Sequence, residues 1–273
     1  MKYKDRYSIG EVSKICNISK KALRYYDKIG LIKSERTINN NYRYYSNESL
    51  LAVPVIKYYK QMGFKLDEMR GFIEGNAYSA IKRSFTTKID ELKKIQEETR
   101  RMYVSVKDWH DLIVEAEMVI ENNIQEVAVK YIESSDYLFQ NQTFNNIMES
   151  IINIEFTNYV EKVDNEITGP VLINFSSVQD RIENKTQNVI IMQKTLKECK
   201  DDEKMIFGGQ MMISCYHIGP HETIDETYRK IKNWAINHNY KTGDESFERY
   251  VTDYWTTRST SQFVTEVMMT VSR

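Results

Sequence analysis

The amino-acid sequence predicts an all-α N-terminal domain of the winged helix-turn-helix type, a long coiled-coil dimerisation helix, and an α+β C-terminal domain built from two repeated β-α-β-β type units. Three patterns carry this prediction. Two short amphipathic helices come first, an apolar stripe then recurs at steps of three and four, and the order strand, helix, further strands occurs twice after about residue 125. The domains are therefore expected at 1–77, 78–121 and 122–273.

The N-terminal domain begins with two helices over residues 7–30. Ser8 is followed three residues later by Glu11, which is the spacing of a capping box, and Ser19 can cap the second helix. Gly30 is expected to end that helix as its C-cap. Two helices joined by a tight turn, the second of them basic, are typical of a helix-turn-helix.

Residues 31–46 are expected to form a hairpin, because the run of Asn residues favours a turn and the aromatic run after it favours a strand. In its position after the second helix, this hairpin would be a wing. Two further helices are expected over 47–62 and 66–74, with Asn47 and Asp67 as their caps.

The stretch from about 79 to 120 contains no Gly or Pro and has charged residues outside its apolar stripe. A stripe so narrow on a helix so long is typical of a coiled coil and predicts a partner helix. The alternative, a helix that packs on its own domain, remains open. The stripe consists of Ile81, Phe85, Ile89, Leu92, Ile95, Thr99, Met102, Val106, Trp109 and Ile113.

The C-terminal part mixes strand and helix patterns, and its order repeats. This repetition predicts a structural duplication, although no sequence identity is visible between the halves. Strands are expected at 126–132, 188–196, 210–218 and 262–271, and helices near 143–163 and 222–238.

Charge is distributed unevenly along the chain. Residues 1–70 hold 15 Lys and Arg against 7 Asp and Glu, whereas the remainder holds 23 against 32. A basic segment joined to an acidic one indicates a polyanion partner for the first and a neutral or cationic partner for the second.

The chain has three cysteines, Cys16, Cys199 and Cys215, and none belongs to a C-x-x-C pair. This pattern argues against a disulfide framework and against a zinc site, so we expect no metal and no cofactor. The sequence also lacks the apolar core of a signal peptide and any apolar run of about 18 residues. We therefore expect a cytoplasmic protein with no membrane partner.

Lysines, arginines and tyrosines gather on the second helix, on the hairpin and on the helix after it. Arginine reaches both base edges and phosphates of duplex DNA, and a tyrosine hydroxyl can bond a phosphate. Tyr26 and Tyr44 are interpreted as core aromatics instead. The expected DNA contacts are Lys20, Lys21, Arg24, Tyr25, Tyr42, Arg43, Lys57 and Lys60.

The run "YSIGEVSKICNISKKALRYYDKIGLIKSERTINNNYRYYS", followed by "MGFKLDEM", closely resembles the DNA-binding domain of MerR-family transcription regulators. The resemblance covers about residues 7–75 and implies a winged helix-turn-helix whose long helix pairs antiparallel in a homodimer. It implies binding to a pseudo-palindromic promoter site, and activation by distorting the DNA so that RNA polymerase can start. By this resemblance Arg24 and Tyr25 read the major groove, and Tyr42 and Arg43 serve the wing.

The C-terminal part resembles GyrI-like effector-binding domains of multidrug-sensing regulators. The residues that carry the resemblance are "YHIGPHETIDETYRKIKNWAINHNY", "FERYVTDYW" and "TEVMMTV". It implies two α/β units facing a pocket for a small organic effector, lipophilic and possibly cationic. Metal-sensing MerR members carry cysteines near the end of the dimer helix, and "WHDLIVEAEMVIENN" contains none.

A buried carboxylate among aromatic rings attracts a lipophilic cation. Alternation places Glu266 on one strand face with Val264 and Met268, and a glutamate on such a face needs a functional reason or solvent exposure. The resemblance assigns the acidic role in the pocket to Glu266. The expected effector-binding residues are Tyr216, Tyr250, Tyr254, Trp255, Glu266 and Met268.

Two other functions remain open. The C-terminal domain resembles stand-alone domains that act as hydrolases on reactive lipophilic compounds, in which case Glu266 with Tyr216 or Tyr250 would be the acid–base pair. It could also bind a protein in place of a small molecule. The basic N-terminal domain favours a regulator that is no enzyme and has no catalytic residues.

Overall fold

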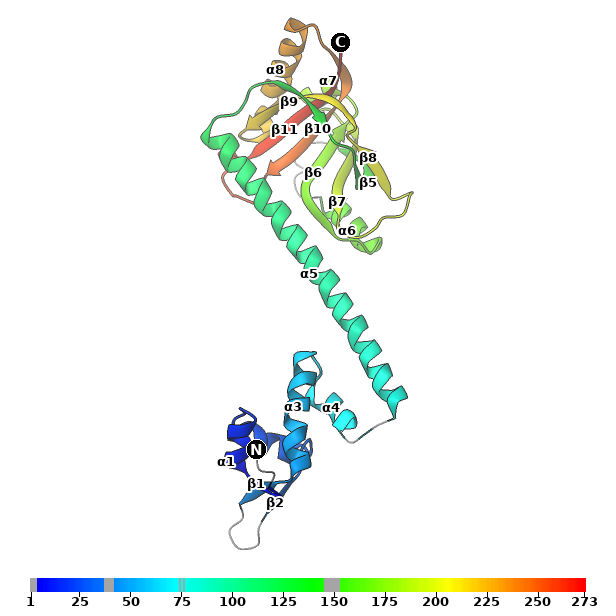
Figure 1. The fold of residues 1–273 in the computed structure, drawn as a ribbon. Coiled ribbons are helices and arrows are strands. Elements are labelled where there is room, and N and C mark those ends of the chain that lie inside the picture. Colours follow the sequence, from blue (N-terminus) through cyan, green and yellow to red (C-terminus); the bar gives the residue numbers. More distant parts are fainter. Residues whose placement is uncertain (1–3, 37–41, 74, 76, 145–152) are drawn as a thin grey trace. The chain divides into compact units, whose positions relative to one another are not determined.

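The computed structural model describes residues 4–36, 42–73, 75, 77–144 and 153–273. The chain forms two compact units, Met1–Glu97 and Glu98–Arg273. Helix α5 (Tyr78–Glu121) contributes residues to both units (Figure 1).

The N-terminal unit packs four short helices and a small antiparallel sheet around one apolar core. Leu23, Val53 and Ile56 are fully buried in it. The sheet has the order β1-β3-β2. Its elements are β1 (Tyr7–Ser8), α1 (Ile9–Ile15), α2 (Lys20–Lys28), β2 (Ser34–Arg36), β3 (Arg43–Tyr45), α3 (Asn47–Gln61) and α4 (Leu66–Ile73).

The predicted caps of the first two helices are confirmed. The Ser8 hydroxyl accepts from the Glu11 N–H while the Glu11 carboxylate accepts from the Ser8 N–H, so the capping box is complete. Ser19 accepts from the N–H of Ala22 at 3.1 Å. Gly30 follows α2 with φ +74°, a left-handed conformation that glycine adopts without strain.

The sequence prediction was wrong at three positions of this unit. Ser46, not Asn47, caps α3, because its extended backbone lets the hydroxyl accept from the Ser49 N–H. Asp67 lies inside the first turn of α4. Tyr45 is the fully buried tyrosine of β3, while Tyr44 is half-buried. The tip of the expected hairpin, 37–41, lies outside the described residues, and β2 and β3 pair antiparallel beside it.

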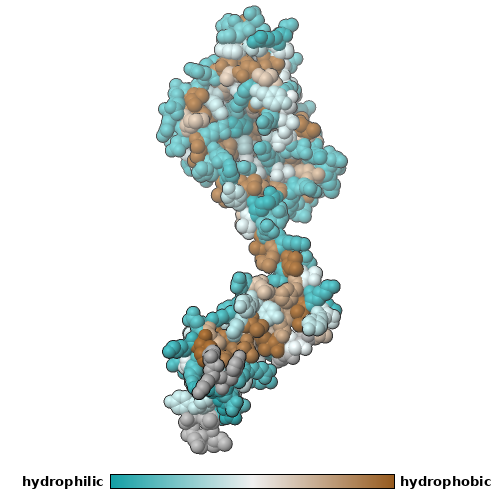
Figure 2. Space-filling model, viewed as in Figure 1, coloured by the Kyte–Doolittle hydropathy of each residue, from teal (hydrophilic) through white to brown (hydrophobic). Residues whose placement is uncertain are grey.

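The apolar stripe of α5 is divided between different surroundings. Phe85 packs on the core of the N-terminal unit. Leu112, Ala116 and Val119 pack with Val251 and Val264 in the C-terminal unit. Between these ends the stripe is exposed to solvent, and Figure 2 shows hydrophobic side chains at the surface over this helix. The exposed members include Ile89, Leu92, Met102 and Val106, from 48% to 69%.

The C-terminal unit is built on one eight-stranded antiparallel sheet with the order β4-β9-β11-β10-β6-β7-β5-β8. Read inward from its two edges, the sheet presents β4-β9-β11-β10 and β8-β5-β7-β6. The strands are β4 (Ala128–Ile132), β5 (Ser135–Phe144), β6 (Ile167–Phe175), β7 (Gln187–Thr195), β8 (Lys204–Phe207), β9 (Gln210–Ile218), β10 (Lys241–Thr252) and β11 (Val264–Ser272).

Three α-helices cover one face of this sheet, α6 on the half with β6 and β7, and α7 and α8 on the half with β9 to β11 (Figure 1). Val267 and Met269 of β11 pack under Tyr228 of α8. Val264 of the same strand contacts α5, as expected from the alternation of side chains along a strand. The helical segments are α6 (Ile154–Lys162), α7 (Val178–Ile182), η2 (His221–Thr223), α8 (Ile224–Asn237) and η3 (Thr260–Gln262).

The four predicted strands coincide with β4, β7, β9 and β11 to within a few residues. The first predicted helix, near 143–163, was placed too early. Phe144 still belongs to β5, where it pairs with Gln187 of β7, and α6 begins at Ile154. The segment between them, 145–152, lies outside the described residues.

Candidate functional site

Helix α2 presents a basic face to solvent. Leu23 and Tyr26 point into the core, 0% and 5% exposed, as the helical period requires. The opposite positions carry Lys20, Lys21, Arg24 and Tyr25, all exposed. Tyr25 is 51% exposed.

Cations from three other elements fix the position of α2. Arg43 of β3 donates from Nε to Asp27 at 2.8 Å. Lys57 of α3 donates to the carbonyls of Cys16 and Asn17 in the turn between α1 and α2. Arg70 of α4 donates to the carbonyl of Ile29 at 2.6 Å, at the other end of α2. The bonds from Lys57 and Arg70 satisfy carbonyls that a helix end leaves without partners, whereas Arg43 bonds a side chain of α2.

The remaining residues expected to contact DNA therefore fall into two groups. Tyr42 at the hairpin and Lys60 on α3 are exposed to solvent. Arg43 and Lys57 take part in the internal bonds just described, and Arg43 is half-buried.

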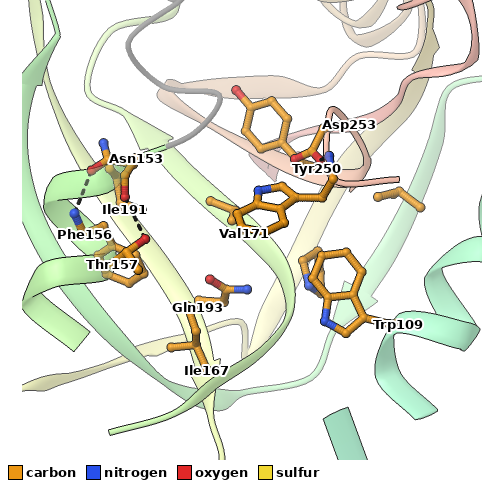
Figure 3. A pocket seen from close by; sticks show the side chains of 13 residues that line it. Trp109, Asn153, Phe156, Thr157, Ile167, Val171, Ile191, Gln193, Tyr250 and Asp253 are labelled. Carbon is orange, nitrogen blue, oxygen red and sulfur yellow. Dashed lines mark hydrogen bonds between the residues drawn. The ribbon is translucent and has the colours of Figure 1, made fainter. Parts of the chain in front are cut away.

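A cavity of about 190 Å³ lies in the C-terminal unit beside α6. Figure 3 shows Thr157 of α6 and Asn153, the N-cap of that helix, on one side of the cavity and Trp109 of α5 on the other. The described residues that line it are Trp109, Asn153, Phe156, Thr157, Ile167, Pro170, Val171, Ile191, Gln193, Tyr250, Val251, Asp253 and Trp255.

Irregular strand pairing shapes the walls of the cavity. The pairing of β10 with β11 shifts between Tyr250 and Thr252, and Tyr250 and Val251 both line the cavity. The pairing of β6 with β7 shifts between Thr168 and Leu172, where Gly169 has φ +72°. The freed carbonyl of Gly169 accepts from the Gln193 amide at 2.7 Å, which fixes that side chain in the wall.

Two polar contacts fix α5 beside the cavity. Asp108 accepts from the Thr168 hydroxyl at 3.0 Å, and Arg101 pairs with Glu166 at 2.9 Å. Both partners belong to β6 or to the residue before it. Since Asp108 adjoins Trp109, these contacts determine where the indole enters the wall.

Asp253 is the one carboxylate among the described residues that line the cavity, and none of them is cationic. It is 6% exposed. Its Oδ1 accepts from the N–H of Trp255 at 2.8 Å. Burial raises the pKa of Asp253 to about 6, and the Trp255 N–H opposes this shift without cancelling it.

Glu248 lies behind Tyr250 in a fully bonded buried cluster. Its carboxylate accepts from Arg181 Nε at 2.7 Å, from the Tyr228 hydroxyl at 2.9 Å and from the Tyr250 hydroxyl at 2.8 Å. Burial alone would raise the pKa of Glu248, but the charge of Arg181 and these donors shift it below its ordinary value. Tyr250 thus connects the cavity wall to a carboxylate that already has a counter-charge.

Glu266 belongs to a second cluster, on the face of the sheet that meets α5. Arg249 donates to it from Nε at 2.9 Å, and Lys130 forms an ion pair with it. Burial would raise the pKa of Glu266, but Arg249 and Lys130 bring it below its ordinary value. Arg249 also pairs with Glu115 of α5, which accepts from the Tyr216 hydroxyl at 2.7 Å.

The residues expected to bind an effector are thus distributed over different sites. Tyr250 and Trp255 line the cavity. Tyr216 and Glu266 lie in the cluster with Arg249. The ring of Tyr254 packs on Phe263 at 4.8 Å, and Met268 lies in the apolar core with Phe247.

Each of the two units matches a known protein family. Residues 125–272, more than half of the chain, match the family described as the GyrI-like small molecule binding domain. The chain belongs to the GyrI-like family. Residues 8–45 match the MerR family regulatory protein, so a MerR-type N-terminal domain precedes the GyrI-like domain.

Two of the curated relatives are regulators of multidrug-efflux transporters. The chain is 28% identical over 142 residues to the multidrug-efflux transporter 2 regulator of Bacillus subtilis, covering 52% of this chain and 51% of the relative. It is 51% identical over 65 residues to the multidrug-efflux transporter 1 regulator of that organism, covering 23% of each. The chain thus matches about half of the length of the first relative and about a quarter of the second.

Among solved structures, the EcmrR–DNA complex in EcmrR-RPo aligns over 98% of this chain and 100% of its own at 18% identity, with a TM-score of 0.48. That similarity is too low to support an inference.

Within the described residues, no helix is long and apolar enough to cross a membrane, and no group of three His, Cys, Asp or Glu side chains could hold a metal ion.

The sequence pattern does not single out several residues that line the cavity or lie behind its wall. Glu248 and Asp253 stand in the quoted run "FERYVTDYW", and alternation along β10 would have put Glu248 on one face with Tyr250. Trp109 was assigned to the dimer stripe of α5. No local signal marks Gln193, whose place depends on the irregular pairing of β6.

We predict that Asp253→Asn stabilises the GyrI-like domain above about pH 7. The pKa of Asp253 is raised in the folded state to about 6 from 3.8, so its contribution to stability is full at low pH and is lost as the pH rises through 6. The neutral amide avoids this loss and can still accept from the Trp255 N–H. We therefore expect the free energy of unfolding of Asp253→Asn to exceed that of the parent by about 2 kcal/mol at about pH 8, and by less at about pH 4.

Denaturant unfolding followed by tryptophan fluorescence measures this gain, because Trp109, Trp234 and Trp255 all lie in the C-terminal unit. Asp244→Asn, at an exposed position on β10, the strand that leads to Asp253, is the control and should change little. Equal or lower stability of Asp253→Asn at about pH 8 would contradict the prediction.

Proposed function

We propose that the chain is a DNA-binding transcription regulator that acts as a homodimer and responds to a small organic effector. The observation that carries this proposal is the exposed basic face of α2, in the segment that matches the MerR family. The names of the two Bacillus subtilis relatives, both regulators of multidrug-efflux transporters, support it.

On this proposal α2 enters the major groove of a promoter site. Arg24 and Lys20 would reach base edges, while Lys21, Tyr25 and Lys60 would contact the phosphate backbone. The hairpin would act as a wing through Tyr42, beside Arg43. Lys57 would act indirectly, because its ammonium group already bonds the turn before α2. The dimer would distort the promoter so that RNA polymerase can start.

The exposed middle of the α5 stripe supports pairing with a second copy, in the antiparallel coiled coil expected for 78–121. Leu92 and Val106 are 48% and 69% exposed, which is costly for side chains of this size along one helix face. We propose that the two copies bury this stripe against each other.

We propose that the effector binds in the cavity beside α6, within the domain expected at 122–273. The wall includes Trp109, so an effector there would contact α5 directly. The sheet order supports a duplication of one β-α-β-β unit, because the four strands counted inward from either edge follow the same pattern. Residues of both copies line the cavity.

We further propose that the cavity binds its effector without chemical turnover. Glu266 is paired with Arg249 and Lys130, and Glu248 with Arg181, so both carboxylates have pKa values below the ordinary range. A general acid needs the opposite shift to be protonated near neutral pH, so neither of these carboxylates fits that role. Asp253, whose pKa is raised to about 6, is the one carboxylate of the described cavity wall with such a shift, and turnover through it is what the following measurement tests. If purified protein consumed candidate effectors over time, this part of the proposal would fail.

Replacing Arg24 with Ala is predicted to weaken binding to a duplex from the promoter of the chain's own gene by about 10- to 100-fold, since a base contact is lost. Affinity for an unrelated duplex should fall much less. Electrophoretic mobility shift with unrelated competitor DNA measures both.

Arg229→Ala is the matched control, since Arg229 is exposed on α8 in the other unit and its substitution should leave DNA binding unchanged. Full retention of promoter specificity by Arg24→Ala would rule out the assigned role of α2.

The double variant Leu92→Gln, Val106→Gln is predicted to raise the dimer dissociation constant by about 100-fold or more, because four apolar side chains per dimer lose their burial. Sedimentation velocity of the full chain measures the dimer fraction. Lys94→Gln, on the opposite side of α5, should leave that fraction unchanged. A double variant that stays as dimeric as the parent would contradict pairing through this stripe.

A further inference from the structure

Among the described residues of the C-terminal unit, three carboxylates are almost fully buried, Glu248, Asp253 and Glu266, at 0%, 6% and 1% exposure. Arg181 compensates the charge of the first, and Arg249 and Lys130 compensate the third. Within the described residues, no cation pairs with Asp253. It is also the one of the three that lines the cavity.

We infer that Asp253 is the counter-charge for a small organic cation bound in the cavity between the indoles of Trp109 and Trp255. This inference rests on the proposed role of the cavity as the effector site and names the charge of the effector and the residue that recognises it. It transfers the acidic role from Glu266, whose charge is already compensated, to Asp253.

The surroundings of Asp253 fit a cation with an aromatic or alkyl body. Trp255 is 64% exposed and Trp109 also lines the cavity, so two indole rings are available for cation–π contact. Phe156, Val171 and Ile191 form an apolar wall. Thr157 and Gln193 add polar groups. The volume of about 190 Å³ is below that of drug-sized sites, which favours a ligand of about ten heavy atoms.

A purely structural role explains Asp253 less well. Oδ1 accepts from the N–H of Trp255, and the backbone carbonyl of Asp253 accepts from Thr256 and Thr257, so the residue does begin a turn. An asparagine would make the same bonds without a buried charge. Oδ2 accepts no bond from the described residues, which leaves one carboxylate oxygen for a charged donor of the ligand.

The test compares 2-phenylethylammonium with its neutral analogue 2-phenylethanol on the full chain, by quenching of tryptophan fluorescence at about pH 7.5, where Asp253 is ionised. The parent chain should bind the ammonium at least about tenfold more tightly than the alcohol. In Asp253→Asn this ratio should fall to about one, with affinity for the alcohol unchanged.

Asp244→Asn is the matched control, because it makes the same change of carboxylate to amide at an exposed position of β10 outside the described cavity wall, and it should retain the tenfold preference. The unfolding measurement above shows whether Asp253→Asn is folded. A preference that survives in Asp253→Asn, or that disappears equally in Asp244→Asn, overturns the inference. If the alcohol binds as well as the ammonium in the parent, the cavity remains an effector site and the charge assignment fails. If neither probe binds at up to about 10 mM, both fail.

Discussion

The contact on which the C-terminal unit depends is the pairing of Arg249 with Glu266 and Glu115. Arg249 stands on β10, Glu266 on the neighbouring strand β11, and Glu115 on α5, so one guanidinium joins two central strands to the helix. A buried arginine of this kind is stable only when its donors are satisfied by carboxylates in good geometry. The position of α5 along the sheet follows from that requirement, and with it the entry of Trp109 into the cavity wall.

Strand β10 presents an acidic side chain to one face of the sheet and a basic side chain to the other. Glu248 and Arg249 are neighbours on β10, so their side chains leave opposite faces of the sheet. Arg181 meets Glu248 under the helices, while Arg249 meets α5 on the other face. The buried charges on these two faces are therefore nearly balanced, and Asp253 differs because it lies just after β10 and no cation of the described residues pairs with it.

Much of the fold could be predicted because its signals are local. Caps such as Ser8 and Ser19, and the period of α5, depend on residues within one or two turns. The site could be predicted only in part. Whether a carboxylate such as Glu248 is compensated depends on Arg181, 67 residues away, and no local pattern reports that pairing. Trp109 fits the period of the dimer stripe. Its position in the cavity wall depends on the packing of α5 against β6, which no local sequence pattern reports. Glu266 is buried, but its partners Arg249 and Lys130 lie on other strands, and the sequence does not report those pairings.

The cations that surround α2 have a consequence for the energetics of recognition. Lys57, Arg70 and Arg43 bond its two ends and its side chain Asp27, so the helix is already rigid before any partner arrives. Ordering a flexible segment on binding consumes part of the interaction free energy, whereas a rigid one retains it for the contacts themselves. The N-terminal unit thus uses some of its positive side chains to reduce the entropy lost on association, and not to attract the partner.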